Sequence, residues 1–101
     1  MAPLPAIRDA VRTALAAIQC HVYLYGSRAR GDAAPDSDYD VLVVVDDAKV
    51  DTALRRKVQD AVYPLCLAND AVITTHIMES TRYRSERTPF LLNIRREAVA
   101  L

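Results

Sequence analysis

The spacing of apolar residues predicts two amphipathic helices. Between residues 4 and 18, apolar side chains recur every three or four positions, as on one face of a helix. A longer stripe with the same spacing covers residues 48–66. We expect Asp47 to cap this second helix. We also expect Pro64 to end or bend it, because proline lacks the amide hydrogen that the helix requires.

Three shorter apolar runs predict strands. They are HVYLY at residues 21–25, DYDVLVVV at residues 38–45 and DAVITTHIM at residues 70–78. All three are rich in β-branched or aromatic side chains, which favour the pleated sheet. The valine run of the second segment is typical of a strand that is buried on both faces.

Capping residues and prolines mark the remaining elements. The first strand is followed by a loop in which we expect one helical turn, residues 27–30, with Ser27 as its cap. The polar residues 79–87 predict a short helix. Thr88, followed by proline, is typical of a helix start, and this last helix is expected to run through about Glu97.

The order of the elements decides the fold class. A helix, a strand, a turn, a strand, a helix, a strand and further helices indicate an α/β or α+β domain with a small sheet. The length of 101 residues is that of one such domain. We therefore expect residues 1–101 to form a single domain.

Charge and cysteine content narrow the classes of function. The chain has 13 Lys or Arg and 13 Asp or Glu, so its formal net charge is zero. This balance argues against direct nucleic-acid binding, which needs a basic patch or stripe. Cys20 and Cys66 stand alone among apolar residues, and we interpret them as reduced core residues of a cytoplasmic protein. Charged side chains interrupt residues 4–18, so no membrane span is expected there.

Two carboxylates at the start of the valine-rich strand form the main chemical signal. Asp38 and Asp40 stand two positions apart, so on a strand they point to the same face. Two carboxylates that lie close together repel each other unless a cation lies between them. Mg²⁺ fits this role, because it prefers oxygen ligands and completes its shell with substrate phosphates.

The loop before these carboxylates offers a complement for phosphate. Gly26 allows the backbone to approach a ligand closely, and Ser27 supplies a hydroxyl. Arg28 and Arg30 can balance phosphate charge. Each feature alone is common in proteins. A metal-binding pair of carboxylates that faces a phosphate-binding turn is typical of sites for phosphoryl or nucleotidyl transfer.

The whole segment resembles a known signature. GSRARGDAAPDSDYDVLVV, residues 26–44, is similar to the signature of the polymerase-beta-type nucleotidyltransferase superfamily. Its spacing, Gly-Ser followed after ten residues by Asp-x-Asp, resembles that of the minimal nucleotidyltransferases, small proteins often encoded beside HEPN-domain toxins. The tail PFLLNIRREAVAL, residues 89–101, also looks like the end of that group. The resemblance implies a polymerase-beta-like fold with a three- to four-stranded mixed sheet flanked by helices.

The resemblance also implies an activity. It is that of an ATP- and Mg²⁺-dependent adenylyltransferase, which moves AMP onto a hydroxyl and releases pyrophosphate. In the antitoxin branch of the family, the acceptor is a tyrosine of a partner HEPN ribonuclease, and the modification silences that toxin. Carried over to this chain, Gly26 and Ser27 would hold the triphosphate, and Asp38 and Asp40 would ligate two Mg²⁺ ions. Arg30 matches the arginine of the family's Arg-Gly pair.

The family usually has a third carboxylate on the next strand. Asp70 is the acid near the start of that segment, in LANDAVITT. On a strand, alternation would put Asp70 on the same face as Thr74, and the acid would then complete a catalytic and metal-binding triad. Alternatively, Asp70 ends the turn together with Asn69, since both are common turn residues.

Other functions remain open from the sequence. The domain could neutralise a toxin by complex formation alone, with weak or absent catalysis, or it could use a small molecule or an RNA as acceptor. In the arginine-rich C-terminal segment, Phe90, Leu91 and Ile94 are candidate apolar anchors for a partner. A small domain of this kind is also compatible with homo- or hetero-oligomers.

Overall fold

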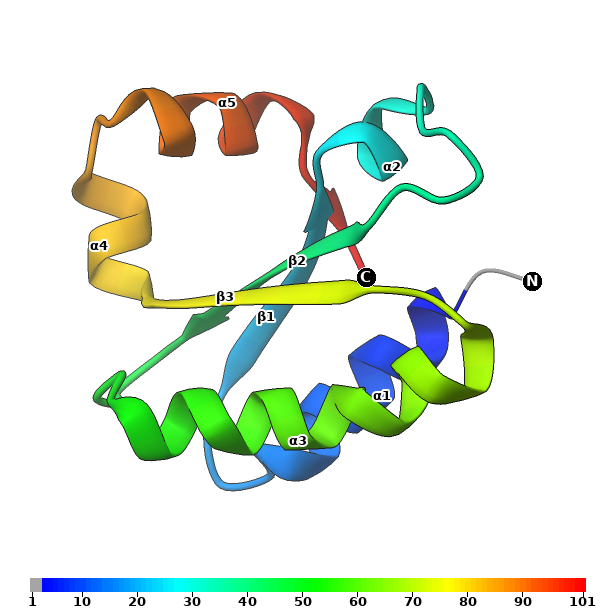
Figure 1. The fold of residues 1–101 in the computed structure, drawn as a ribbon. Coiled ribbons are helices and arrows are strands. Elements are labelled where there is room, and N and C mark those ends of the chain that lie inside the picture. The colour runs from blue at the N-terminus through cyan, green and yellow to red at the C-terminus, as the bar shows by residue number, and fades with distance from the viewer. Residues whose placement is uncertain (1–2) are drawn as a thin grey trace.

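The computed structural model describes residues 3–101. Figure 1 shows a four-stranded sheet with helices on both of its sides. The elements in chain order are α1 (Leu4–Ala14), β1 (Cys20–Tyr25), α2 (Ser27–Arg30), β2 (Tyr39–Val45), α3 (Thr52–Asn69), β3 (Ile73–Glu79), α4 (Ser80–Ser85), α5 (Pro89–Glu97) and β4 (Val99–Ala100).

The sheet is mixed, as expected. Its strand order is β3-β2-β1-β4, with β1 antiparallel to both of its neighbours and β2 parallel to β3. The register places Tyr25 of β1 opposite Asp40 of β2, and Asp40 opposite Thr74 of β3. These three side chains therefore lie in one row on one face of the sheet. The short strand β4 was not predicted from the sequence.

The two faces of the sheet are buried by different helices. On one, which we call the α3 face, Val41 and Val43 pack in a core with residues of α1 and α3. On the other, the α5 face, Leu42 and Val44 pack with Met78 and with residues of α5. Figure 1 shows α1 and α3 below the sheet and α5 above it. The valine-rich strand is thus covered on both sides, as its sequence predicts, and Asp40 belongs to the α5 face by alternation.

The start of α3 differs from the prediction. Asp51, and not Asp47, is the cap, and its Oδ1 accepts a hydrogen bond of 2.9 Å from the amide of Leu54. Asp47 instead lies in the preceding turn with a left-handed backbone, at φ 50°. Both residues are acids after a strand, and the sequence around them does not distinguish the two positions.

Pro64 was predicted to end or bend α3. It does not end the helix, which continues to Asn69. Val62 before the proline is buried, and Leu65 after it also packs against the core. Burial of such a side chain contributes about 1.5–3 kcal/mol. Proline inside a helix costs about 3 kcal/mol. The free energy gained by burying these side chains is therefore large enough to offset the cost of proline inside the helix.

The other helix starts agree with the prediction in part. Thr88 caps α5, with its Oγ1 accepting from the amide of Leu91 at 3.3 Å. The cap of α2 is Gly26, so the assignment of Ser27 as the cap is wrong by one residue.

Of the three predicted docking residues, only Phe90 is exposed, at 42%, whereas Leu91 and Ile94 belong to the core. The periodicity of α5 explains this result, because positions 91 and 94 are three residues apart and share the inner face of the helix. Among the described residues, no helix has the length and apolar character needed to cross a membrane.

Candidate active site

The two predicted carboxylates lie at the beginning of β2. The strand starts at Tyr39, whose amide donates to the carbonyl of Val72 at 2.9 Å. Asp40 is therefore the second residue of the strand and is partly buried, whereas Asp38 directly precedes the strand and is exposed. Strand alternation fixes the face of Asp40. The strand was predicted to start at Asp38 and instead starts one residue later, so alternation does not fix the face of Asp38.

Gly26 lies against the Asp40 carboxylate. A Cβ at this glycine would overlap Oδ2 of Asp40 and lie 3.3 Å from its Cγ. The backbone of Gly26 has φ 77° and ψ −158°, a conformation that other residues rarely adopt. Both observations require glycine. The structure thus brings Gly26 of the Gly-Ser turn against Asp40.

Thr74 of β3 completes the row on the other side of Asp40. Its hydroxyl Oγ1 donates to Oδ1 of Asp40 at 2.7 Å. A short bond from a neutral donor orients the carboxylate without neutralising its charge. The sequence does not predict this role, because threonine is common in strands and gives no signal of its own.

Asp70 does not lie on a strand. It is the left-handed C-cap of α3, with φ 47° and ψ 50°, and β3 begins only at Ile73. The expectation that alternation places Asp70 on the face of Thr74 is therefore wrong, since the alternation starts three residues later. Within residues 3–101, no three carboxylate, histidine or cysteine side chains are grouped so that they could hold a metal ion.

The arginines of α2 are engaged within the protein. The guanidinium of Arg28 donates to the carbonyls of Ser37 at 2.9 Å and Pro35 at 3.0 Å, and it lies 4.3 Å from the centre of the Tyr39 ring. It therefore holds the loop that leads to Asp38. Arg30 forms an ion pair with Asp32 at 3.2 Å.

A second carboxylate holds Arg30 and the Gly-Ser turn. Glu97, the last residue of α5, accepts hydrogen bonds from the amide of Gly26 at 3.2 Å and from Arg30 at 3.2 Å. Its side chain is 21% exposed. No sequence pattern pointed to this contact, because 71 positions separate the two partners.

Phe90 contacts two side chains of the sheet on the α5 face. The ring of Phe90 is 5.8 Å from that of Tyr25, edge to face, and 5.3 Å from that of His76. Burial, together with the charge of Asp40, raises the pKa of Tyr25. Burial, with smaller effects of Arg55 and Arg82, lowers the pKa of His76, so its imidazole is neutral at pH 7.

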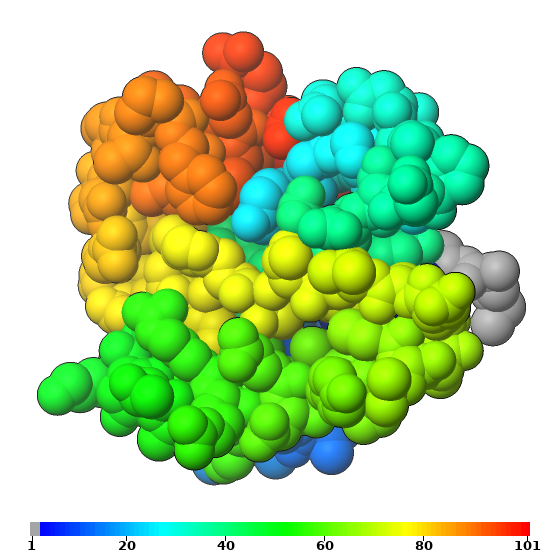
Figure 2. Space-filling view, viewed as in Figure 1, coloured from blue at the N-terminus to red at the C-terminus, as the bar shows by residue number. Residues whose placement is uncertain are grey.

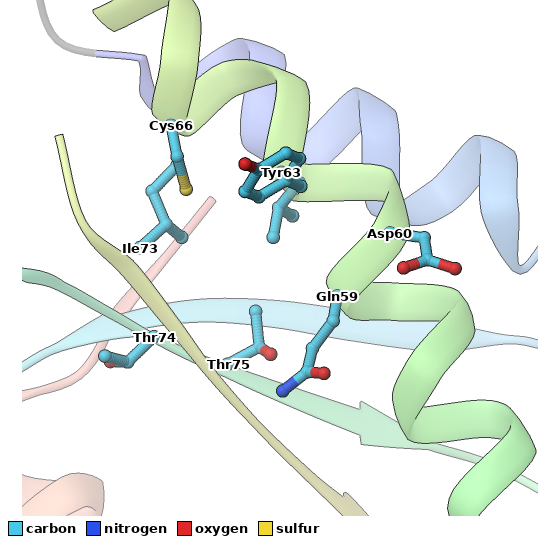
Figure 3. A pocket seen from close by; sticks show the side chains of 8 residues that line it. Gln59, Asp60, Tyr63, Cys66, Ile73, Thr74 and Thr75 are labelled. Carbon is cyan, nitrogen blue, oxygen red and sulfur yellow. The ribbon is translucent and has the colours of Figure 1, made fainter. Parts of the chain in front are cut away.

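A cavity of about 440 Å³ lies on the other face of the sheet, between α3 and β3. Figure 3 shows that it is lined by Gln59, Tyr63 and Cys66 of α3 and by Thr75 of β3. Thr74, whose hydroxyl donates to Asp40, also lines this cavity, so the cavity reaches the β3 end of the carboxylate row.

The donors fit a magnesium ion that is shared with phosphates. Mg²⁺ is usually held by one or two carboxylates and by phosphate oxygens of the substrate. Asp38 and Asp40 supply two carboxylates, and the backbone of Gly26 lies directly against the carboxylate of Asp40. Such an arrangement can hold a nucleoside triphosphate through its metal ions.

Comparison with known proteins points the same way. The family model described as a nucleotidyltransferase domain matches residues 4–98. No curated protein sequence matches the chain significantly.

Solved structures share the fold. A toxin–antitoxin structure with AMP-PNP is 21% identical, with a TM-score of 0.68, over 95% of this chain and 69% of that one. A putative nucleotidyltransferase from Sulfolobus solfataricus is 19% identical, with a TM-score of 0.66, over 96% of this chain and 74% of that one. A structure of the tri-AMPylated HEPN toxin of Shewanella oneidensis in complex with MNT antitoxin is 19% identical, with a TM-score of 0.61, over 95% of this chain and 66% of that one.

Proposed function

Because the chain belongs to the nucleotidyltransferase domain family, we propose that it transfers AMP from ATP to a tyrosine hydroxyl of a HEPN-domain toxin and acts as its antitoxin. The observation that carries this proposal is the contact between Gly26 and Asp40, which puts the Gly-Ser turn directly beside the Asp40 carboxylate. The toxin–antitoxin structures with a related fold, one with an ATP analogue and one with an AMPylated toxin, support the choice of nucleotide and partner.

The roles of the residues follow from their positions. Asp38 and Asp40 would hold the Mg²⁺ ions. The bound metal would neutralise the triphosphate and activate the attacking oxygen. The backbone at Gly26 and Ser27 would hold the terminal phosphates. Thr74 keeps the Asp40 carboxylate in one orientation through its 2.7 Å hydrogen bond.

The transfer itself is a displacement at the α-phosphorus. The phenol oxygen of the acceptor forms a bond to this phosphorus, and the bond to the bridging oxygen of the β-phosphate breaks. Pyrophosphate leaves with the bonding electrons, and the phenol proton is released. The attacking and leaving oxygens lie roughly in line, so positioning and charge stabilisation supply most of the catalysis.

Substitution of the carboxylates tests the assignment. Asp40→Asn should abolish the transfer of labelled AMP to the co-expressed toxin and leave the fold intact, because the amide keeps the shape and removes the charge. Asp36→Asn is the matched control, since Asp36 is an exposed acid of the same loop. Mass spectrometry of the toxin would detect AMP on tyrosine. Retained transfer by the Asp38→Asn/Asp40→Asn double variant would refute the proposal.

A second function is favoured by one observation. Asp70 lies at the cap of α3, and the described residues contain no group of three metal ligands. The domain would then neutralise the toxin by complex formation, with little catalysis. Under this alternative, the Asp38→Asn/Asp40→Asn variant would still protect cells from the toxin. Loss of protection in that variant, with complex formation retained, would decide for the enzyme.

A further inference from the structure

The row of Tyr25, Asp40 and Thr74 across the sheet indicates on which side of Asp40 the phosphates and the acceptor would lie. Gly26 and the turn that would bind the terminal phosphates lie on the β1 side of Asp40. Thr74 lies on its β3 side. In an in-line displacement, the acceptor enters opposite the leaving pyrophosphate. With the terminal phosphates at that turn, the acceptor oxygen would approach Asp40 from the β3 side.

Three side chains of the α5 face meet there. Thr74 and His76 stand two positions apart on β3, so they point to the same face. The ring of Phe90 is close both to Tyr25 of β1 and to His76 of β3, which are the strands on either side of β2. The ring therefore lies above β2 at the level of Asp40 and Leu42, the residues opposite Tyr25 and His76. Figure 2 shows α5 (orange to red) and α2 (cyan) on either side of this region, with β3 (yellow) below.

We propose that Phe90, His76 and Thr74 form the subsite for the acceptor, and that this subsite selects an aromatic hydroxyl, the phenol of a tyrosine. The inference rests on the proposed function, since it uses the direction of AMP transfer. It goes further in naming the residues that recognise the acceptor.

The chemistry of the three side chains fits a phenol. Phe90 is 42% exposed although it contacts two other rings, and its free surface can take one more ring edge to face. The neutral imidazole of His76 has a lone pair that can accept a hydrogen bond from the phenol. Thr74 is short, so it leaves room for a side chain to reach Asp40. A serine or threonine acceptor would have no ring to pack against Phe90.

Binding of a small phenol tests the subsite directly. The ¹⁵N-labelled protein, saturated with Mg²⁺ and a non-hydrolysable ATP analogue, is titrated with N-acetyl-tyrosinamide and followed by NMR. We expect the amide signals of Thr74, His76 and Phe90 to shift, with no such response to N-acetyl-serinamide. Shifts centred on another surface, or no shifts in protein saturated with nucleotide, would overturn the proposal.

Variants of α5 separate the subsite from the rest of the fold. Phe90→Leu should weaken N-acetyl-tyrosinamide binding by about two- to tenfold, the usual range for one aromatic pair. Phe90→Tyr should retain binding, because it keeps the ring. Leu92→Ala is the control, since Leu92 is a comparably exposed residue of the same helix. Equal losses in Phe90→Leu and Leu92→Ala would contradict the subsite.

The nucleotide must be measured separately. Phe90→Leu should bind the Mg²⁺–ATP analogue as the unmodified protein does, whereas Asp40→Asn should not. If Phe90→Leu lost nucleotide affinity and kept phenol binding, Phe90 would contact the nucleobase, and the acceptor assignment would be wrong. If the unmodified protein did not bind the analogue at all, the proposed function itself would fail.

Discussion

Replacement of Gly26 by alanine is the sharpest test of the site geometry. The new methyl group would overlap Oδ2 of Asp40, and the backbone at φ 77° is one that alanine rarely adopts. The strained backbone alone costs about 1–3 kcal/mol. For a domain of this size, each kcal/mol lowers the melting temperature by about 4–8 °C. We therefore expect a clearly less stable protein that still folds.

The effect on the site should exceed the effect on stability. Relief of the overlap requires Asp40 or the Gly-Ser turn to move by about 1 Å, and a misplacement of this size costs about 10²-fold in rate. Gly26→Ala should therefore lose most AMP transfer and most affinity for Mg²⁺–ATP. Calorimetric titration with the ATP analogue measures the affinity, and thermal unfolding shows how much of the protein is folded.

Gly31→Ala is a matched control for the backbone strain. Gly31 also has a positive φ, at 85°, but no atom lies within 4 Å of a Cβ at that position. Its replacement should lower stability by about 1–2 kcal/mol, the cost of a left-handed residue, and leave nucleotide binding nearly unchanged. Equal nucleotide affinity in the two alanine variants would show that the contact between Gly26 and Asp40 does not shape the site.

Two further predictions concern the surroundings of the site. Glu97→Ala should lower the free energy of unfolding, measured by urea titration, by about 1 kcal/mol, because it removes the hydrogen bonds to Gly26 and Arg30. The control Glu86→Ala removes an exposed ion pair and should lower the free energy of unfolding by less. Burial lowers the pKa of His76 below its unfolded value of 6.5, so the unfolded state binds the proton more readily. Stability should fall as the pH drops below about 6.5, and His76→Gln should flatten this dependence in thermal scans between pH 5 and 8; an unchanged slope would refute the role of His76.

The helices and strands were largely predictable because their signals are local. The valine run of β2 and the Thr88 cap of α5 depend on neighbours within a few residues. The same local reasoning failed at Asp47 and Pro64. At the start of α3, the cap depends on the residue at which the helix begins, which is Asp51 and not Asp47. At Pro64, continuation of the helix depends on how strongly the residues after the proline pack against the core.

The third carboxylate shows the limit of alternation as an argument. Asp70 and Thr74 differ by an even number of positions, so a continuous strand would have placed them on one face. The strand instead begins at Ile73, after the left-handed cap at Asp70. The start of β3 is set by its pairing with β2, which begins at Ile73. This pairing cannot be predicted from residues 70–78 alone.

By itself, the sequence determined the order in which the elements follow, and it indicated which residues would carry the proposed chemistry. The Gly-Ser turn and the Asp-x-Asp segment are close in the chain, so their juxtaposition needs only one hairpin between β1 and β2. The tertiary structure alone decided that Thr74, Glu97 and Phe90 join them. These contacts link residues tens of positions apart, and they exist only because the packing of the sheet and of α5 brings distant segments to the same place.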